Sequence, residues 1–405
     1  MIQEIATKID MVSNEIIDEY FEDHMRIFES DNEKKREFYK TISIKQKRWS
    51  KQQTCIVEGC SEKSIKRSHT IQKSGPIASV SRNSLVYVPE QDYKTGQLVI
   101  KSKGINEAST FPGFCSEHEK IFSSFEEDKN LFSEEAITLQ LYRTVCRELF
   151  RLSVEQEMFQ KQMEEYISFR DSKFLLMTKE RLTEKWLKEN DVNLTSISFR
   201  EDSLLKALEK NIQEIAETYN VIESQHLAQL TEAIKNNNEK SLNASVVNVD
   251  TLIPVAMSGF GAFHVTEDRR VLVFIGVYPN VEKNETCIVL FSSSEDKDYF
   301  NAYMNQFTNI LDLLNIVERF MVRGTDHWFI HPQLWDDMSE QKKQTILSET
   351  IIRGKGIDFP LDYSIFDELR SEIIEYAEAV ELPLEEQNKL ASEKEKLNKA
   401  FKSDS

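Results

Sequence analysis

The chain has 405 residues, of which 40% are hydrophobic and 30% are charged. This balance excludes wholesale disorder, and the length is typical of two or three domains. No run of about 18 apolar residues occurs, and the N-terminus lacks the basic start and apolar block of a signal peptide. We therefore expect a cytoplasmic protein without a membrane segment.

Charge is unevenly distributed along the chain. The formal net charge of −18 argues against a protein that coats nucleic acid over its whole surface. Residues 31–75, however, contain twelve basic and five acidic residues, a local net charge of +7. This basic region is a candidate contact for nucleic acid, in particular DNA. The five cysteines are too few for a disulfide framework.

The first half of the chain is predicted to be mainly helical. Residues 1–50 have apolar side chains at helical spacing, and the second helix there is basic and leads into Trp49. Residues 51–128 hold cysteines, histidines and short β-type runs at 84–88 and 97–100. Residues 129–243 form a long helical segment, which has no Gly or Pro between 131 and 238 and a break at 190–195. Helices at 131–238 offer a surface for a homodimer or a protein partner.

The second half changes character near residue 244. Three β-rich runs at 254–265, 271–278 and 286–291, with turns at 267–268 and 280–284, predict an antiparallel meander. A helix over 298–323 and further helices complete a domain at 244–380, which we interpret as a sensing or partner domain. Residues 381–405 form a charged tail, which we expect to be a solvated or frayed helix. The predicted fold class is α+β, in a mostly helical chain.

Two short Cys/His pairs predict a structural zinc site. Cys55 and Cys60 flank a turn that contains Gly59, and Cys115 and His118 stand at an expected helix start. Zinc prefers four thiolate or imidazole ligands in a tetrahedron, and two paired motifs from distant segments commonly supply them. The alternative is that these are ordinary buried cysteines.

The segment between the pairs reads Lys66-Arg-Ser-His69-Thr-Ile-Gln-Lys73. With it, residues 55–119 resemble an HNH-type, treble-clef (ββα-metal) endonuclease module. The resemblance implies that His69 is the general base, that Asn83 orients it, and that Glu119 helps to bind a catalytic Mg²⁺ or Mn²⁺. The residue before the histidine is Ser68 where the family has a metal ligand, and about thirty residues separate Asn83 from Cys115.

Each of these residues also has a simpler interpretation. His69 suits a phosphate contact without catalysis, Asn83 a turn, and Glu119 the acidic first turn of a helix. Lys66, Arg67 and Lys73 are candidate contacts to nucleic acid. Arg143 and Arg147, with Arg151, form a basic stripe that suits phosphates or surface pairs with Glu148 and Glu155.

Two further motifs carry no predicted chemistry. Residues 258–262, Ser-Gly-Phe-Gly-Ala, lack the rest of a nucleotide-binding loop and suggest a strand bulge or a close backbone contact. Residues 326–332, which include His327 and His331, suggest core packing. The leading hypothesis is therefore a metal-dependent HNH-like endonuclease, such as a host-defence or mobile-element effector. Its rivals are a zinc-stabilised module that binds nucleic acid or protein without cleavage, and an interaction scaffold.

Overall fold

The computed structural model describes residues 2–21, 43–92, 97–128, 133–196, 202–266, 269–350, 356–379 and 384–399. The predicted turn at 267–268 and residues 31–42 of the basic region lie outside these ranges. The chain divides into two compact units, which we call the helical unit (Met1–Trp49 with Arg151–Asn220) and the sheet unit (Ser50–Phe150 with Val221–Ser405). This division differs from the predicted one, because the long helix α5 (Glu134–Leu182) contributes to both units.

The helical unit contains helices in both of the regions for which they were predicted, residues 1–50 and the long helical segment at 129–243. It contains α1 (Ile2–Ile16), η1 (Ile17–Phe21), most of a helix over 43–50, the later part of α5, α6 (Glu184–Glu189) and most of α7 (Ser203–Val221). Val12 and Ile16 pack against Phe174 and Leu182 of α5. The first break falls at Thr183, earlier than predicted, where φ is +62° and the hydroxyl caps the backbone N–H of Trp186.

The sheet unit is built on a seven-stranded sheet in the order β3-β2-β9-β6-β7-β8-β5, and neighbouring strands are antiparallel. The predicted meander is confirmed, with the 280–284 turn between β7 and β8. The strands are β2 (Leu85–Gln91), β3 (Leu98–Gly104), β5 (Ala244–Val249), β6 (Val255–Thr266), β7 (Arg269–Asn280), β8 (Glu285–Ser292) and β9 (Trp328–Ile330). The α+β class follows from this arrangement.

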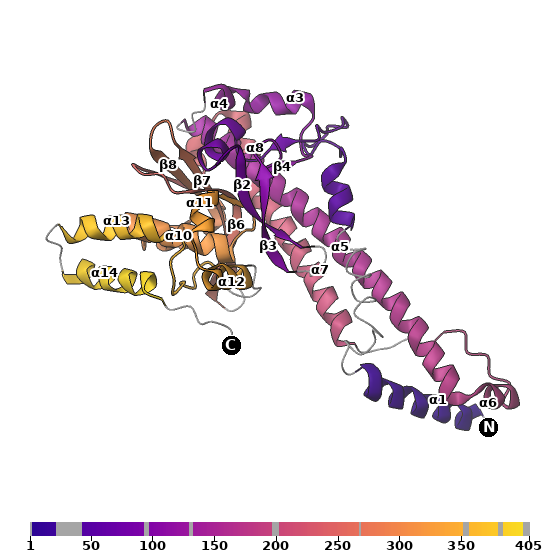
Figure 1. Cartoon of the computed structure of the whole chain (residues 1–405). Coiled ribbons are helices and arrows are strands. Elements are labelled where there is room, and N and C mark those ends of the chain that lie inside the picture. The colour runs from indigo at the N-terminus through magenta and orange to yellow at the C-terminus, as the bar shows by residue number, and fades with distance from the viewer. Residues whose placement is uncertain are drawn as a thin grey trace. The chain divides into compact units, whose positions relative to one another are not determined.

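Side chains of β7 alternate between two buried faces. Val273, Ile275 and Val277 join the main core against α10 (Ile310–Arg323). On the other face, Phe274 contacts His226 of η5 (Ile222–Leu227), a segment that continues into α8 (Ala228–Asn236). A strand that is buried on both sides reads as a continuous apolar run, as this one does. The helices on the two sides of the sheet can be followed in Figure 1.

The C-terminal helices differ from prediction in two places. The expected helix over 298–323 is interrupted, because Asn309 caps the backbone N–H of Asp312 and starts α10 separately from α9 (Lys297–Met304). The expected charged tail contains α14 (Leu384–Leu397), in which Leu390 joins the core. The other helices here are α11 (Pro332–Asp336), α12 (Glu340–Glu349) and α13 (Asp367–Glu378). Among the described residues, no helix has the length and apolar character needed to cross a membrane.

The predicted module at 51–128 is not a separate domain. Its two-stranded hairpin joins β1 (Ser68–His69) to β4 (Thr110–Phe111), and α3 (Ser116–Glu119) follows. In the sequence, β2 and β3 lie between β1 and β4. They belong to the large sheet, in which Tyr87 of β2 pairs with Ile330 of β9. Strand pairing of this kind fuses the module with the predicted 244–380 domain. A local sequence pattern does not specify such a distant partner.

Candidate metal centre

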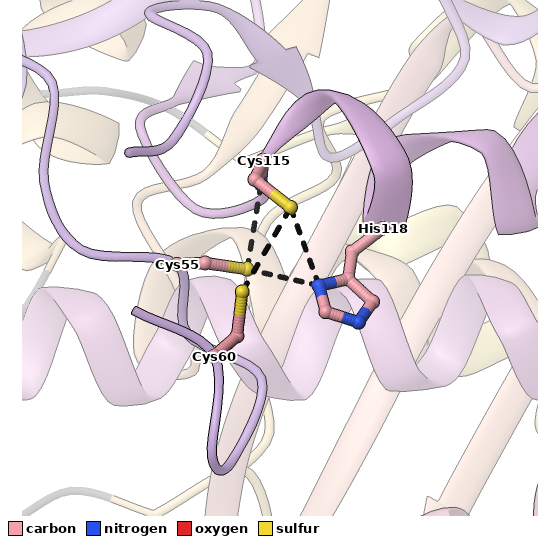
Figure 2. A group of neighbouring side chains, drawn as sticks. All are labelled: Cys55, Cys60, Cys115 and His118. Atoms are coloured by element: carbon pink, nitrogen blue, oxygen red, sulfur yellow. Dashed lines mark hydrogen bonds between the residues drawn. The ribbon is translucent and has the colours of Figure 1, made fainter. Parts of the chain in front are cut away.

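Cys55, Cys60, Cys115 and His118 converge on one point, as Figure 2 shows. Their ligand atoms all lie within 4.8 Å of one another. The Nδ1 atom of His118 is 3.3 Å from the Sγ atoms of both Cys55 and Cys115, and Cys60 Sγ is 4.0 Å from Cys115 Sγ. Four ligands around one zinc ion stand about 3.3–3.8 Å apart. The group can therefore hold a metal ion such as zinc.

The first pair of ligands lies on a tight loop. The backbone N–H of Cys55 donates to Glu62 O at 2.9 Å, and that of Cys60 donates to Val57 O at 3.1 Å, which turns the two thiols toward each other. Gly59 has φ +77°, a left-handed conformation that glycine adopts without a steric penalty. The sequence Val-Glu-Gly-Cys therefore sets the geometry of this pair locally.

The second pair lies at the start of α3. Cys115 is the N-cap residue, and His118 follows within the first turn, so both side chains reach the same point. A hydrogen bond from the backbone N–H of His118 lowers the pKa of the Cys115 thiol, whereas burial raises the pKa of the Cys55 thiol. Backbone hydrogen bonds from Ile56 to Gly113 O and from Ile65 to Phe114 O join the two pairs. A metal ion would compensate for the little apolar surface of this loop-rich region.

His69 lies on the hairpin beside this centre, opposite Thr110. Its Nε2 atom is buried and has no hydrogen-bond partner among the described residues. Burial lowers the pKa of His69, and the nearby charges of Arg143 and Lys73 act in the same direction, while a backbone hydrogen bond with Ile105 and the charge of Glu126 oppose them. The imidazole is therefore neutral at pH 7, with a free lone pair available to accept a proton.

Glu119 is brought next to the histidine strand. Its Oε2 atom accepts a 2.6 Å hydrogen bond from Ser68 Oγ, and its Oε1 atom lies 2.9 Å from Arg143 Nη2. The other arm of the guanidinium is 2.7 Å from Glu126 Oε1. Burial raises the pKa of the Glu119 carboxyl, against the opposing effects of Arg143 and Ser68. Serine and glutamate thus occupy adjoining positions, where the resemblance implies a metal ligand.

The prediction that Arg143 and Arg147 form an exposed basic stripe is wrong. The Arg143 side chain is 0% exposed and stacks 4.0 Å above the Phe122 ring, and Arg147 is 9% exposed and pairs with Glu148. Neither side chain forms part of an accessible basic surface. The prediction failed because residues 136–150 of α5 are all buried, so the helical period did not mark an outer face. Arg151 pairs with Glu155, the alternative that the sequence left open.

Asn83 lies in a turn, and among the described residues no hydrogen bond joins it to His69. It has φ +54° and occupies a two-residue turn with Ser84, in which Arg82 and Leu85 exchange backbone hydrogen bonds. Its side chain is exposed, so the turn interpretation is the correct one. Lys66, Arg67 and Lys73, the candidate contacts to nucleic acid, are exposed; Arg67 lies 2.8 Å from Glu107, and Lys73 donates to Asn106 Oδ1.

The sequence analysis did not identify two residues of this site. Glu126 shares Arg143 with Glu119, and Gln140 of α5 donates a 2.7 Å hydrogen bond to the carbonyl of Thr70, next to His69. Glu126 lies seven residues after Glu119, a helical spacing that places two carboxylates on one side of a helix. Nothing in the sequence around Gln140 indicates its contact. No protein-family model, curated protein or solved structure matches the chain.

Proposed function

We propose that residues 55–119 form a zinc-stabilised, HNH-like hydrolytic centre that acts on the phosphodiester bonds of nucleic acid. One observation carries this proposal: the half-buried His69 has a buried Nε2 atom without a hydrogen-bond partner among the described residues, on a strand that the Ser68–Glu119 hydrogen bond joins to α3. Buried polar atoms are normally hydrogen-bonded, and a reacting water would supply the partner that Nε2 lacks among the described residues.

Zinc would have a structural role. Three thiolates and one imidazole form a complete set of four ligands, which leaves no open position for a reacting water. Two of the cysteines are buried, and backbone hydrogen bonds already turn the thiols of Cys55 and Cys60 toward each other. The ion would hold the loop of Cys55 and Cys60 to the start of α3, and Glu119 of α3 contacts the strand of His69 through its hydrogen bond with Ser68.

Two groups of residues would have different roles in the reaction. His69 would accept a proton from the attacking water, since its neutral imidazole has a free nitrogen. Exposed Lys66, Arg67 and Lys73 on the flanks of the hairpin would attract and position phosphates. Their positive charges would also favour the negative charge that develops on the phosphate oxygens.

The predicted catalytic Mg²⁺ or Mn²⁺ does not fit the described arrangement. Both oxygens of Glu119 already have partners, and the Arg143 guanidinium also pairs with Glu126. A divalent ion bound to Glu119 would lie beside this buried positive charge, and their repulsion would be strong. We therefore derive no catalytic step through such an ion.

The test is a cleavage assay on the full chain, with labelled single- and double-stranded DNA and RNA, with and without added Mg²⁺ or Mn²⁺. Wild-type protein should cleave at least one substrate, and His69→Ala should abolish cleavage while its zinc content and circular dichroism stay unchanged. Asn83→Gly is the matched control, because glycine tolerates the positive φ of an exposed turn. Cleavage that survives in His69→Ala would overturn the assignment.

A second function, binding without cleavage, is favoured by Arg143. A carboxylate pair neutralised by a buried guanidinium is a stable structural arrangement and needs no substrate. This alternative predicts salt-dependent binding of nucleic acid by the wild-type chain, with no nicked or shortened products under any of the assay conditions.

A further inference from the structure

Two motifs that play no part in the proposed chemistry meet in the sheet unit. They are residues 258–262 of β6 and residues 326–332 around β9. A Cβ atom on Gly259 would lie 2.3 Å from Thr325 Oγ1, so only glycine permits this approach. Thr325 Oγ1 in turn accepts a 3.1 Å hydrogen bond from the backbone N–H of His327. The close contact of Gly259 with Thr325, of the kind predicted for the glycine motif, therefore places His327 next to β6.

His327 is 7% exposed, and its ring bridges two serines. The Nδ1 atom lies 3.0 Å from both the carbonyl oxygen and the hydroxyl of Ser258, and Nε2 lies 3.3 Å from Ser109 Oγ. A carbonyl only accepts hydrogen bonds, so we assign the proton to Nδ1 and leave Nε2 to accept from the Ser109 hydroxyl. Burial lowers the pKa of His327 well below its usual value, which agrees with a neutral ring.

Ser109 holds the segment that follows His69. Its carbonyl accepts a 2.6 Å hydrogen bond from the Thr70 N–H, and its hydroxyl accepts a 2.8 Å hydrogen bond from the Ile71 N–H. Ser109 has φ +58°, a left-handed backbone conformation that is strained for most residues other than glycine, asparagine and aspartate. Such strain persists only where surrounding contacts enforce it. The His327 contact to the Ser109 hydroxyl is one of them.

We propose that His327 is a positioning residue for His69 and acts through Ser109. The hydrogen bonds run in one direction, from the Ile71 N–H to Ser109 Oγ, from the Ser109 hydroxyl to His327 Nε2, and from His327 Nδ1 to the Ser258 carbonyl. The sheet that was expected to serve as a separate domain thereby fixes the strand of the general base. The catalytic meaning of this contact rests on the proposed function, whereas the contact itself does not.

The first experiment needs no substrate. Amide hydrogen exchange is measured for Ile71 in zinc-loaded wild-type protein and in the His327→Phe, His327→Gln and Ser109→Ala variants. His327→Phe and Ser109→Ala should speed Ile71 exchange by about tenfold or more, because the N–H loses its fixed acceptor. His327→Gln should stay near wild type, since its amide oxygen can accept from Ser109. Amides of Val273 and Ile275, in the centre of the sheet, report whether each variant is folded.

The second experiment uses the cleavage assay. His327→Phe should lower kcat by about tenfold with little change in KM, because small misplacement of a reacting group costs rate more than binding, and His327→Gln should restore most of the loss. If wild-type protein does not cleave at all, the proposed function fails while the exchange data still decide the positioning role. Unchanged Ile71 exchange in folded His327→Phe, or faster exchange in Ser109→Ala alone, overturns that role.

Discussion

Arg143 Nη2 lies 2.9 Å from Glu119 Oε1, and this contact joins a residue expected on the surface to one expected to bind a catalytic metal. The arginine is completely buried, whereas Glu119 and Glu126 retain 21% and 35% of their side-chain exposure. The guanidinium therefore lies on the inner side of both carboxylates. It packs on Phe122 and Phe125, which places an ion pair and an aromatic cluster in the same small volume.

The first prediction concerns the stability of this ion pair. Arg143→Met should lower the free energy of unfolding by about 3 kcal/mol, because two partly buried carboxylates lose their counter-charge. Adding Glu119→Gln and Glu126→Gln to Arg143→Met should recover part of this loss. Chemical denaturation of the zinc-loaded proteins measures both effects. A loss below about 0.5 kcal/mol for Arg143→Met would show that the pair behaves like an exposed one.

The second prediction concerns the metal. Purified protein should contain about one zinc ion per chain, and Co²⁺ in its place should give the visible spectrum of a tetrahedral thiolate site. Cys60→Ser should weaken zinc binding by more than about 100-fold, since loss of an outer hydrogen-bond partner alone costs about 10- to 100-fold. Cys146→Ser is the control, because Cys146 is buried outside the group. Equal zinc loss in both variants would contradict the assignment of the ligands.

The third prediction concerns pH and His226. The side chain is buried between Phe274 and Phe291, and burial lowers its pKa to about 4, although backbone groups of Val221 and Leu272 oppose the shift. Below pH 6.5 the unfolded chain gains a proton at this residue before the folded chain does. Stability from this group is therefore complete above about pH 6.5 and falls as the pH drops toward 4.

Replacement by phenylalanine removes this contribution. The loss of unfolding free energy between pH 6.5 and about 4 should be about 3 kcal/mol smaller in His226→Phe than in wild type. Thermal or chemical unfolding of both proteins across this range gives the difference, and the titration of every other group cancels in the comparison. Parallel pH profiles for the two proteins would mean that His226 is not held neutral.

The fourth prediction concerns the last helices. Arg370 is completely buried, pairs with Glu318 at 2.6 Å, and also pairs with Glu393 of α14. Arg370→Met should destabilise the sheet unit by about 3–5 kcal/mol, because it leaves buried carboxylates uncompensated. Lys394→Met is the matched control, because Lys394 of α14 pairs with Glu378 of α13 on the surface, where such pairs contribute about 0–1 kcal/mol. Similar losses for both variants would count against a buried ionic cluster.

The fifth prediction concerns nucleic acid. If Lys66, Arg67 and Lys73 contact phosphates, their combined replacement by alanine should flatten the plot of log affinity against log salt by about 0.9 per contact on duplex DNA. The control replaces Lys235, Lys240 and Lys283, which are exposed elsewhere on the sheet unit, and changes the net charge equally. Equal effects of the two triple variants would point to charge alone, without a defined contact surface.

Much of the site follows from the sequence, because its parts are local. The spacing of Cys55 with Cys60 and of Cys115 with His118 already indicates two candidate ligand pairs, and the β-branched and aromatic residues of the run 271–278 favour a buried strand. The position of Asn83 before Ser84 likewise suits a turn, whose left-handed backbone asparagine tolerates.

Tertiary structure alone decided which distant groups meet. The sequence separates Arg143 from Glu119, His327 from Ser109, and β2 from β9, and no periodicity distinguishes a buried arginine from an exposed one when its partners lie on other elements. The free energy of each such contact depends on desolvation and on geometry in three dimensions. Residue types and their spacing determined the candidate metal ligands, the helices and the strands, while packing determined that the Cys/His segment and the C-terminal sheet belong to one unit.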